Sequence, residues 1–428
     1  MHPTVVRRVA IVAANRIPFA RSGTAYARIG NRAMLTATLR GLVEKLTLQG
    51  DRLGEVVGGA IMKHARDWNL VRECVLSSGL SPATPAYDLQ QACGTGLEAV
   101  ILVANKIALG QIECGIACGV DTTSDVPVAA NPRLQRALMD LNHARTLPQR
   151  LRASLCALYP GNLIPELPSP REPRTGLSMG QHAERTARVW GIAREDQDAL
   201  ALASHRNLAA AYDSGLLADL LMPYATLERD NNLRADSTAD RLAALAPVFD
   251  RHTGTITAGN ASPLTDGASA VLLASEDWAA SRGLPVMAWF SHAETAAVDF
   301  LEESREGLLM APAYAVPRML ARAGLALQDF DFYELHEAFA AVVLCTLAAW
   351  ESDRFCRERL GLPAALGPID RARINVAGSS IAAGHPFAAT GGRIVATLAR
   401  LLEQRGSGRG LISICAAGGQ GVTAILER

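Results

Sequence analysis

Strand-length apolar runs alternate with longer helical patterns in the first and last thirds of this 428-residue chain. In the first third, strand patterns at 9–13, 55–62, 87–89 and 113–120 alternate with helical patterns at 32–49, 68–78 and 94–109. In the last third, strand patterns at 286–290, 330–334, 373–376 and 411–415 alternate with helical patterns at 312–323, 337–350 and 388–404. Such alternation is typical of an α/β protein. The sequence therefore predicts two related halves, each with a mostly parallel sheet.

The middle of the chain differs in composition. Residues 131–174 contain seven arginines (Arg133, Arg136, Arg145, Arg150, Arg152, Arg171 and Arg174) against three acidic residues, and they end in a proline-rich stretch at 165–173. Helical patterns follow at 180–190 and 194–214. A solvated helix face is the simplest interpretation of any one of these arginines. As a group, they suit the phosphates of a ligand, and the leucines and Met139 between them suit an apolar channel, a partner or a membrane surface.

The charge balance and the cysteines exclude several classes of protein. The 42 basic and 42 acidic residues give no indication of binding to nucleic acid or to a membrane. The eight cysteines lack paired metal-ligand spacing, so we expect no metal and a reducing cytoplasm. Residues 1–8 lack the apolar core of a signal peptide, and no apolar run is long enough to cross a bilayer.

Two cysteines lie in glycine-rich turns near opposite ends of the chain. Cys93 precedes the helical pattern at 94–109, and Cys415 leaves the last strand pattern into Gly418 and Gly419. A buried apolar role is the usual one for a lone cysteine. Crowded glycines argue for a nucleophile instead, because a substrate that approaches sulfur needs backbone without side chains. A helix N-terminus also stabilises a thiolate, so we expect a lowered pKa for Cys93.

Two histidines lie in turns of a similar kind. His336 follows a strand pattern and precedes a helix, and His385 is held between Gly384 and Pro386. An imidazole that removes a thiol proton must be held rigidly within hydrogen-bond reach. His385 therefore suits the role of base, whereas His64, His143, His205 and His292 are interpreted as ordinary structural residues.

The segments around these four residues, with 254–262 and 265–268, resemble the thiolase family over nearly the whole chain. The resemblance implies thiolytic cleavage of a 3-ketoacyl-CoA by coenzyme A to acetyl-CoA and a shortened acyl-CoA. The sequence His-Glu-Ala-Phe at 336–339, Pro263-Leu264, the segment 385–390 and Cys-Ala-Ala-Gly-Gly at 415–419 are most similar to the thiolase subunit of fatty-acid oxidation complexes and of the trifunctional enzyme.

The resemblance implies a thiolase-like fold with two duplicated halves, each built on a mostly parallel five-stranded sheet with helices, and an inserted loop domain. Residues 1–128, completed by 243–284, are expected to form the first half. Residues 129–242 are expected to form the loop domain, which binds coenzyme A, and residues 285–428 the second half.

The resemblance also implies a role for each catalytic group. His385 takes the proton of Cys93, the thiolate attacks the 3-keto carbon, and His336, with a water, stabilises the resulting oxyanion. Cys415 protonates the acetyl-CoA enolate and later takes the thiol proton of coenzyme A. The backbone N–H groups of Cys93 and Ala417 bind the second oxyanion. Coenzyme A is a substrate, and no tightly bound cofactor is expected.

Contacts to coenzyme A are expected at Ser262, Ala258, Arg234 and Met179. The resemblance further implies a homodimer or tetramer, with a hydratase/3-hydroxyacyl-CoA dehydrogenase subunit as an additional partner. A biosynthetic acetoacetyl-CoA thiolase and a non-catalytic thiolase-like subunit are the alternatives. A β-ketoacyl synthase is disfavoured because it lacks the second cysteine.

Three sites depart from the general thiolase pattern and leave the preferred acyl-chain length open. Ser379 and Ser380 stand where Gly-Gly or Gly-Ala is usual, and His182 stands where many relatives have a smaller residue. The segment 308–312 replaces a loop that is normally richer in glycine.

Overall fold

The computed structural model describes residues 6–301 and 307–428. Residues 1–5, on which part of the signal-peptide expectation rests, lie outside this part of the chain. The strands are β1 (Val9–Arg16), β2 (Ala20–Arg21), β3 (Glu55–Gly59), β4 (Ala86–Asp88), β5 (Cys114–Asp121), β6 (Thr265–Ser275), β7 (Ala288–Ala297), β8 (Phe332–Leu335), β9 (Arg409–Ala416) and β10 (Gln420–Glu427).

The helices are α1 (Asn31–Lys45), α2 (Leu70–Leu76), α3 (Thr95–Ala108), α4 (Pro132–His143), α5 (Leu147–Ala157), α6 (Met179–Val189), α7 (Arg194–Asp213), α8 (Ala239–Ala243), α9 (Glu276–Ser281), α10 (Pro312–Ala323), α11 (Ala340–Glu351), α12 (Asp353–Leu360), α13 (Ser380–Ala383) and α14 (Ala389–Arg405). Short 3₁₀ helices are η1 (Ala65–Asp67), η2 (Pro160–Asn162), η3 (Ala218–Leu220) and η4 (Arg371–Arg373).

One continuous sheet contains both halves of the chain. Its strand order is β4-β3-β5-β6-β1-β7-β10-β9-β8, and β2 pairs with β6. The halves meet where 9–11 of β1 pairs antiparallel with 288–290 of β7. The alternation of strands and helices predicted an α/β protein, and that class is confirmed.

The predicted mostly parallel pairing is wrong. Parallel ladders join β3 to β4, β3 to β5 and β8 to β9, whereas the other six ladders among the described residues are antiparallel. A short turn joins β9 to β10, and such a connection allows only antiparallel pairing. The chain also enters β6 beside the end of β5, where Gly267 pairs with Asp121, so β6 runs back along β5.

The predicted strand at 373–376 is replaced by η4 and a single bridge between Tyr333 and Ile374. Asn375 has a φ of 48°, in the left-handed region, which ends extended backbone. Its side-chain amide accepts from the N–H of Leu335 and donates to the Leu335 carbonyl, each at 2.9 Å. A side chain thus makes hydrogen bonds that a further strand residue would otherwise make.

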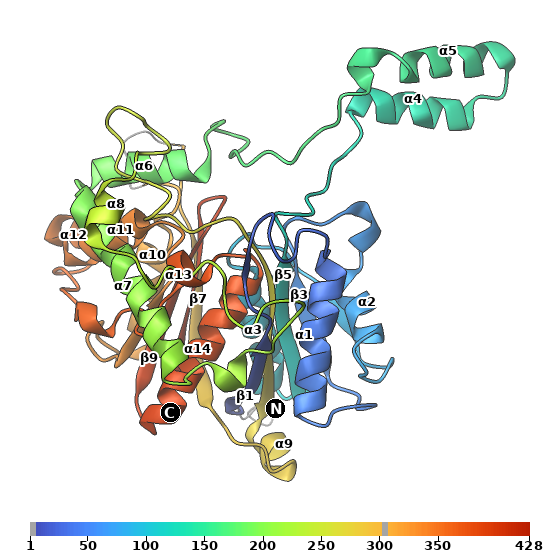
Figure 1. Ribbon diagram of the computed structural model, residues 1–428. Helices are drawn as coiled ribbons and strands as arrows, with labels where there is room; N and C mark the ends of the chain where they lie inside the picture. The colour runs from blue at the N-terminus through green and yellow to red at the C-terminus, as the bar shows by residue number, and fades with distance from the viewer. Residues whose placement is uncertain (1–5, 302–306) are drawn as a thin grey trace.

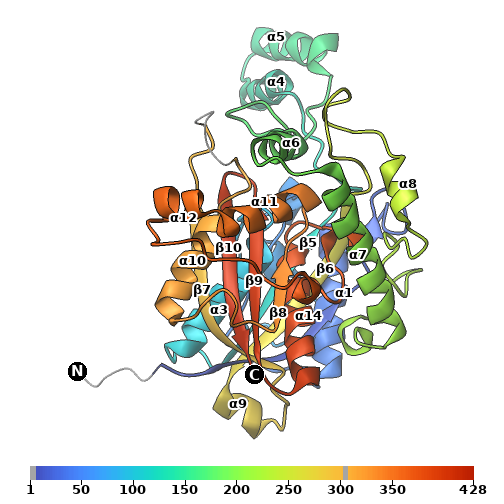
Figure 2. The same cartoon turned by 90° about the vertical axis from the view of Figure 1, so that its left-hand side faces the viewer.

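Helices and sheet form alternating layers. The helices α3 and α14 lie between the two halves of the sheet (Figure 1), and their apolar side chains share one core with β1, β5, β9 and β10. The helices α1 and α2 cover the other face of the N-terminal half, and α10 and α11 cover the other face of the C-terminal half (Figures 1 and 2). Strands with both faces covered are almost continuously apolar, as β5 and β9 are.

The first turns of α3 and α14 approach each other more closely than side chains would allow. A Cβ atom on Gly96 would lie 2.4 Å from the carbonyl oxygen of Ala388, and one on Gly391 would lie 2.2 Å from the backbone nitrogen of Leu97. Glycine at both positions lets the two backbones touch. This contact brings the turn before α3 next to the turn before α14.

The helices α4 and α5 form a hairpin that projects from the layered body (Figures 1 and 2). The side chain of Asn131 accepts from the N–H of Arg133 at the start of α4, and Thr146 and Gln149 form a capping box at the start of α5. Only Ala137, Ala153 and Ala157 are buried along the two helices. None of the helices in the described residues combines the length and the apolar character needed to span a membrane. The domain boundaries expected from the sequence stay a prediction.

A buried ion pair fixes the loop after α7 to the end of β1. The guanidinium of Arg16 donates to both carboxylate oxygens of Asp230 at 2.6 and 2.8 Å, and the two side chains are 4% and 0% exposed. The carboxylate also accepts from the N–H of Phe19, and the hydroxyl of Tyr212 accepts from the N–H of Asp230. Removing one partner would leave the other charge buried and uncompensated.

We therefore expect Asp230→Ala to lower the free energy of unfolding by about 3–5 kcal/mol, the usual cost of breaking a buried pair. Urea denaturation followed by circular dichroism measures this change. The matched control is Glu358→Ala, which removes the partner of Arg354 from a pair that is 85% and 61% exposed. Exposed pairs contribute little, so this variant should unfold like the wild type. Equal shifts in the two variants would contradict the prediction.

Candidate active site

Cys93 lies in the turn between β4 and α3. Ala92 before it has a φ of 45°, which is unusual for a residue other than glycine and forms a sharp bend. The hydroxyl of Thr95 stabilises this bend, because it accepts from the N–H of Gln91 and donates to the carbonyl of Ala92. The bend presents the sulfur of Cys93 toward the C-terminal half.

His385 lies in the turn before α14 and faces that sulfur. Its Nε2 lies 3.1 Å from Sγ of Cys93, and its Nδ1 lies 2.6 Å from the hydroxyl of Thr390. Its backbone N–H donates to the hydroxyl of Thr265, and Gly384 before it has a φ of 105°. The predicted nucleophile and base are therefore in direct contact, although 292 residues separate them in the sequence.

The expected lowering of the Cys93 pKa is wrong for the resting site. Burial raises the pKa of Cys93 to about 12, although the backbone N–H groups of Ala417 and of Cys93 itself oppose this shift. Burial also lowers the pKa of His385 to about 3, with a further contribution from the positive charge of Arg393. Both shifts favour a neutral thiol beside a neutral imidazole. The thiolate forms only when His385 takes the proton.

His336 follows β8 and lies against His385, with 4.2 Å between the ring centroids. Its backbone N–H donates to the carbonyl of Ser413, and its Nδ1 lies 2.8 Å from the hydroxyl of Ser380. Its Nε2 is buried and has no hydrogen-bond partner among the described residues. Burial, then the neighbouring His385 and Arg393, lower the pKa of His336, so this ring is also neutral.

Cys415 lies at the end of β9, opposite Gly421 of β10. It is buried, and its thiol is near enough to Cys93 for a charge there to raise its pKa, although burial is the larger cause. The N–H of Ala417, in the turn that follows, lies close enough to the sulfur of Cys93 to lower its pKa. The structure thus brings together all four predicted catalytic side chains and both predicted backbone donors.

Cys93, His336 and His385 also have the spacing of a metal site. One ligand atom from each lies within 4.8 Å of the others. The 3.1 Å contact between the sulfur and Nε2 of His385 is a hydrogen bond that a metal would have to break. Nucleophilic chemistry suits this arrangement, and the absence of a metal stays an expectation.

A cavity of about 410 Å³ is bordered by the loop at 258–263 and by Ile381 of α13. Arg234 and Ala258, two of the expected coenzyme A contacts, line it. Ser262 does not, although Ala261 and Pro263 on either side of it do. Met179 is elsewhere, in the apolar cluster that contains Cys415. Residues that sequence reasoning missed complete the lining: Arg21, His205, Asn232, Asp236, Ser237, Arg241, Leu242, Leu245, Gly259 and Ile381.

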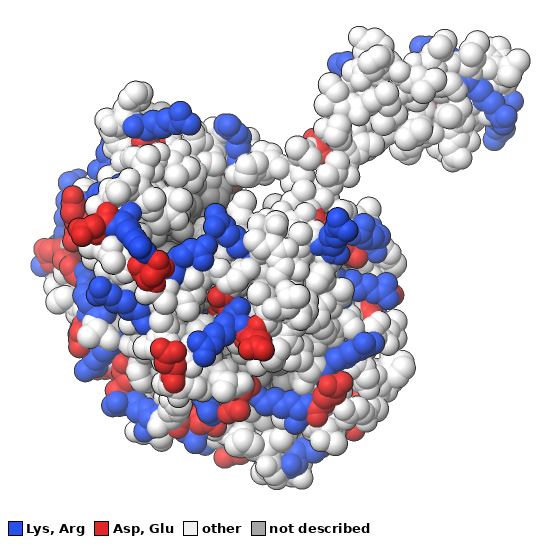
Figure 3. Space-filling model, viewed as in Figure 1, with Lys and Arg blue, Asp and Glu red and all other residues white. Residues whose placement is uncertain are grey.

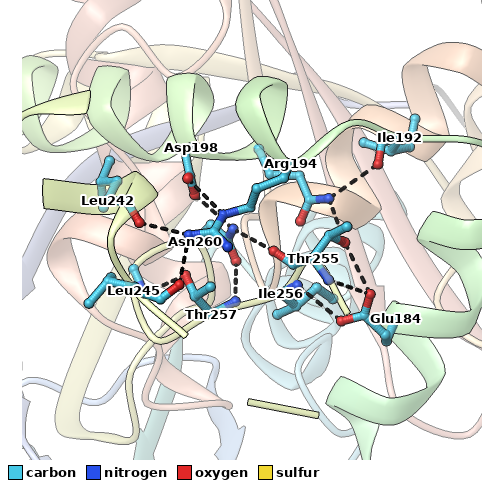
Figure 4. A network of polar contacts seen from close by, with 12 residues as sticks. Glu184, Ile192, Arg194, Asp198, Leu242, Leu245, Thr255, Ile256, Thr257 and Asn260 are labelled. Carbon is cyan, nitrogen blue, oxygen red and sulfur yellow. Dashed lines mark hydrogen bonds and ion pairs between the residues drawn. The ribbon is translucent and has the colours of Figure 1, made fainter. Parts of the chain in front are cut away.

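A buried polar network holds the loop at 255–260 against this cavity (Figure 4). The side chain of Asn260 accepts from the N–H of Thr257 and donates to Asp198 and to the carbonyl of Thr255. Glu184 of α6 accepts from the N–H groups of residues 255 and 256 at 2.7 and 3.0 Å. Arg194 of α7 pairs with Asp198 at 2.7 Å and donates to the carbonyls of Leu242 in α8 and of Leu245 just after it. Side chains of α6 and α7 therefore fix the loop, and Arg194 connects α7 to α8.

Two family models match nearly the whole chain. The N-terminal thiolase domain matches residues 9–277, and the C-terminal thiolase domain matches residues 284–428. The chain belongs to the thiolase family. The thiolase-like fold expected from the sequence is confirmed.

Individual relatives cover this thiolase end to end. A 3-ketoacyl-CoA thiolase of Pectobacterium atrosepticum is 43% identical over 99% of this chain and 98% of its own length. One of Shewanella loihica is 41% identical over 98% and 97%. Among solved structures, the acetyl-CoA acetyltransferase of Bacillus anthracis has a TM-score of 0.81 at 29% identity, over 99% of both chains. Human mitochondrial 3-ketoacyl-CoA thiolase in complex with CoA has a TM-score of 0.79 at 27% identity, over 99% of this chain and 98% of its own.

Two of the unusual segments in this thiolase pack near Cys415. Leu308 and Leu309 are buried in the cluster that contains Cys415 and Met179, and a Cβ on Gly421 would meet the backbone of Pro312. His182 is buried in α6, with its Nε2 2.8 Å from the hydroxyl of Thr175 and its ring edge-on to Phe300. Apolar side chains therefore fill the region beyond Cys415.

The neutral Cys93–His385 pair predicts an unusual pH profile for alkylation. A proton exchanged inside the pair leaves its total charge unchanged, so the thiolate fraction should be constant between the two pKa values. We expect the iodoacetamide rate constant at Cys93, measured by mass spectrometry, to be nearly flat from about pH 5 to pH 9. In His385→Gln, the isolated, partly buried thiol should react more slowly, and its rate should rise about tenfold per pH unit. A tenfold rise per unit in the wild type would contradict the neutral pair.

Proposed function

We propose that this thiolase is a 3-ketoacyl-CoA thiolase, an acetyl-CoA C-acyltransferase of fatty-acid β-oxidation. One observation carries the proposal. The sulfur of Cys93 contacts a neutral imidazole, the N–H of Ala417 lies close enough to lower its pKa, and the second cysteine is buried nearby. A nucleophile, a base, an oxyanion donor and a second acid are the groups that thiolysis needs. The names of the full-length relatives support the same reaction.

In the proposed cleavage step, His385 takes the proton of Cys93 as the sulfur attacks the 3-keto carbon. A ring nitrogen of His336 lies within 4.8 Å of this sulfur, and the unpartnered Nε2 is the donor available for the forming oxyanion. The bond between C2 and C3 then breaks and leaves the acyl group on Cys93. Cys415 gives its proton to the departing acetyl-CoA enolate.

In the second half-reaction, coenzyme A enters through the cavity lined by Arg234 and Ala258. Cys415 takes the thiol proton of coenzyme A, whose sulfur attacks the acyl group on Cys93. The N–H groups of Cys93 and Ala417 stabilise the oxyanion. Release of the shortened acyl-CoA restores the Cys93 thiolate, which recovers its proton from His385. No step requires a tightly bound cofactor.

The alternative function is that of a biosynthetic acetoacetyl-CoA thiolase. The high TM-score to the Bacillus anthracis acetyl-CoA acetyltransferase supports it, because both reactions use the same fold. Pocket length distinguishes them. The buried leucines next to Cys415 would affect this length. An assay with a series of acyl-chain lengths is therefore the informative one.

We expect thiolysis of 3-ketoacyl-CoA substrates longer than acetoacetyl-CoA, measured as loss of substrate absorbance across a chain-length series. Cys93→Ala should form no acyl-enzyme by mass spectrometry. Cys415→Ala should still form some, while turnover falls by roughly 10²- to 10⁴-fold, as for lost acid–base catalysis. Activity confined to acetoacetyl-CoA would favour the biosynthetic alternative. Acyl-enzyme on Cys93→Ala but not on Cys415→Ala would reverse the assignment of the two cysteines.

We propose a homodimer or tetramer as the assembly. The strand β4 ends the sheet, and among the described residues it pairs with β3 alone. An isologous contact along such an edge is a common form of assembly. All eight cysteines are free thiols, which supports the cytoplasm as the compartment.

The α4–α5 hairpin supports a second interface, with a hydratase/3-hydroxyacyl-CoA dehydrogenase subunit. Large apolar side chains are exposed on it and on the segment that follows: Leu138, Met139, Leu147, Leu151, Leu155, Leu158, Tyr159, Leu163, Ile164 and Leu167. Basic side chains stand out on an otherwise largely uncharged surface (Figure 3). Exposed apolar surface of this extent is typical of an interaction site. None of the seven arginines at 131–174 lines the coenzyme A cavity.

Reversing the charge of Arg133, Arg136 and Arg145 to glutamate should weaken co-purification with that subunit. Thiolysis of short substrates should stay near wild type, because the hairpin projects from the layered body and none of its residues lines the cavity. Light scattering should still report a multiple of the 45.4 kDa chain mass. A steep rise in the Michaelis constant for coenzyme A would instead indicate that these arginines bind coenzyme A. A fully active monomer would contradict the proposed dimer.

A further inference from the structure

Ser380 connects His336 to a buried cation. The Nη2 atom of Arg393 in α14 donates to the hydroxyl of Ser380 at 3.0 Å and to that of Ser379 at 3.2 Å. The Ser380 hydroxyl in turn lies 2.8 Å from Nδ1 of His336. All four side chains are buried.

The direction of these hydrogen bonds follows from the available protons. A guanidinium has donors and no acceptor, so the oxygen of Ser380 accepts from Arg393. Nδ1 of His336 is the one remaining partner that the structure gives this hydroxyl among the described residues. If Nδ1 carried a proton, the hydroxyl would accept twice and its own proton would be buried without an acceptor, which is costly. The hydroxyl therefore donates, and Nδ1 accepts.

Because His336 is neutral, its proton must then be on Nε2. This atom is buried and has no partner among the described residues, so it is an unused donor. His336, Cys93 and His385 form one compact group. A carbonyl that reacts with Cys93 must lie next to this group. The opposite tautomer would present a lone pair to the developing negative charge and would repel it.

The surroundings of Arg393 keep this arrangement in place. Burial lowers the pKa of Arg393, and the nearby Glu334 and Glu337 oppose this shift and favour the charged guanidinium. Glu337 is itself fixed by the hydroxyl of Ser204 and by the amide of Asn375, each at 2.7 Å. The positive charge also disfavours protonation of His336 and His385.

We propose that Ser380, oriented by Arg393, is a positioning residue that fixes His336 as the Nε2–H tautomer, so that His336 donates a hydrogen bond to the oxyanion on the reacting carbonyl. The identity of this carbonyl as a 3-keto group rests on the proposed function. The tautomer itself does not, because it is a property of the resting protein.

Kinetics of Ser380→Ala give the first test. The turnover number should fall by roughly 10- to 100-fold, the usual effect of losing the partner that orients a histidine. The Michaelis constant for coenzyme A should stay unchanged, because Ser380 does not line the cavity. Ser379→Ala is the matched control. This substitution removes an adjacent hydroxyl that contacts Arg393 but not His336. The turnover number of this variant should be close to that of the wild type. Ser380→Thr, which keeps a hydroxyl, should recover part of the lost turnover.

A double-mutant cycle separates positioning from a structural effect. In the His336→Gln background, Ser380→Ala should cause almost no further loss, because the residue through which it acts is gone. Equal losses in both backgrounds, or an equal loss in Ser379→Ala, would overturn the proposal.

Ring-¹⁵N NMR of histidine-labelled protein tests the tautomer without any substrate. The His336 signals are assigned by their loss in His336→Gln. Wild type should show a protonated Nε2 and an unprotonated Nδ1, and Ser380→Ala should show a mixture. A protonated Nδ1 in the wild type would overturn the proposal. An enzyme that cleaves no 3-ketoacyl-CoA would instead refute the proposed function and leave the tautomer result standing.

Discussion

The contact between the first turns of α3 and α14 is the constraint on which the proposed active site depends. Cys93 precedes one helix and His385 precedes the other, so the distance between sulfur and imidazole is set by how closely these helices pack. Gly96 and Gly391 allow backbone contact at this point. A side chain at either position would push the helices apart, and proton transfer requires hydrogen-bond distance. The packing of the central layer therefore sets the distance that the proposed mechanism requires, as well as stabilising the fold.

Each element of the site is also fixed by buried polar groups outside it. Asn375 replaces strand pairing next to His336, Thr390 holds Nδ1 of His385, and Asp121 at the end of β5 accepts from the N–H of Ala388. Burial raises the pKa of Asp121 to about 7, although three backbone donors oppose the shift. Such networks are costly when incomplete, so the loops they hold have little freedom to move.

Sequence reasoning succeeded where local chemistry decides the structure. Glycine-rich turns next to strand or helix patterns placed Cys93, His385 and Cys415 in loops or at strand ends, as the structure has them, and helical periodicity located α3 and α14. It failed where the outcome depends on segments distant in the chain. The expectation of a lowered pKa for Cys93 rested on the helix N-terminus and left out burial under the C-terminal half. Arg21 could not be associated with the cavity, because nothing local to it indicates that β2 borders the loop at 255–263.

The strand at 373–376 illustrates the same limit. Its apolar pattern is real, but the left-handed backbone and the amide of Asn375 end it after one bridge. Conversely, Ser379 and Ser380 are visible in the sequence only as departures from a pattern. Their meaning depends on Arg393, and the approach of α14 to α13 cannot be inferred from either serine.

The sequence separation between nucleophile and base has a consequence for synthesis of the chain. Cys93 leaves the ribosome 292 residues before His385. At ordinary rates of translation this interval is roughly 15 to 60 s. During that time the thiol has neither its base nor the N–H of Ala417, so it has only the modest reactivity of an ordinary cysteine. Until both halves have folded together, the thiol therefore lacks the groups that the proposed acyl transfer requires.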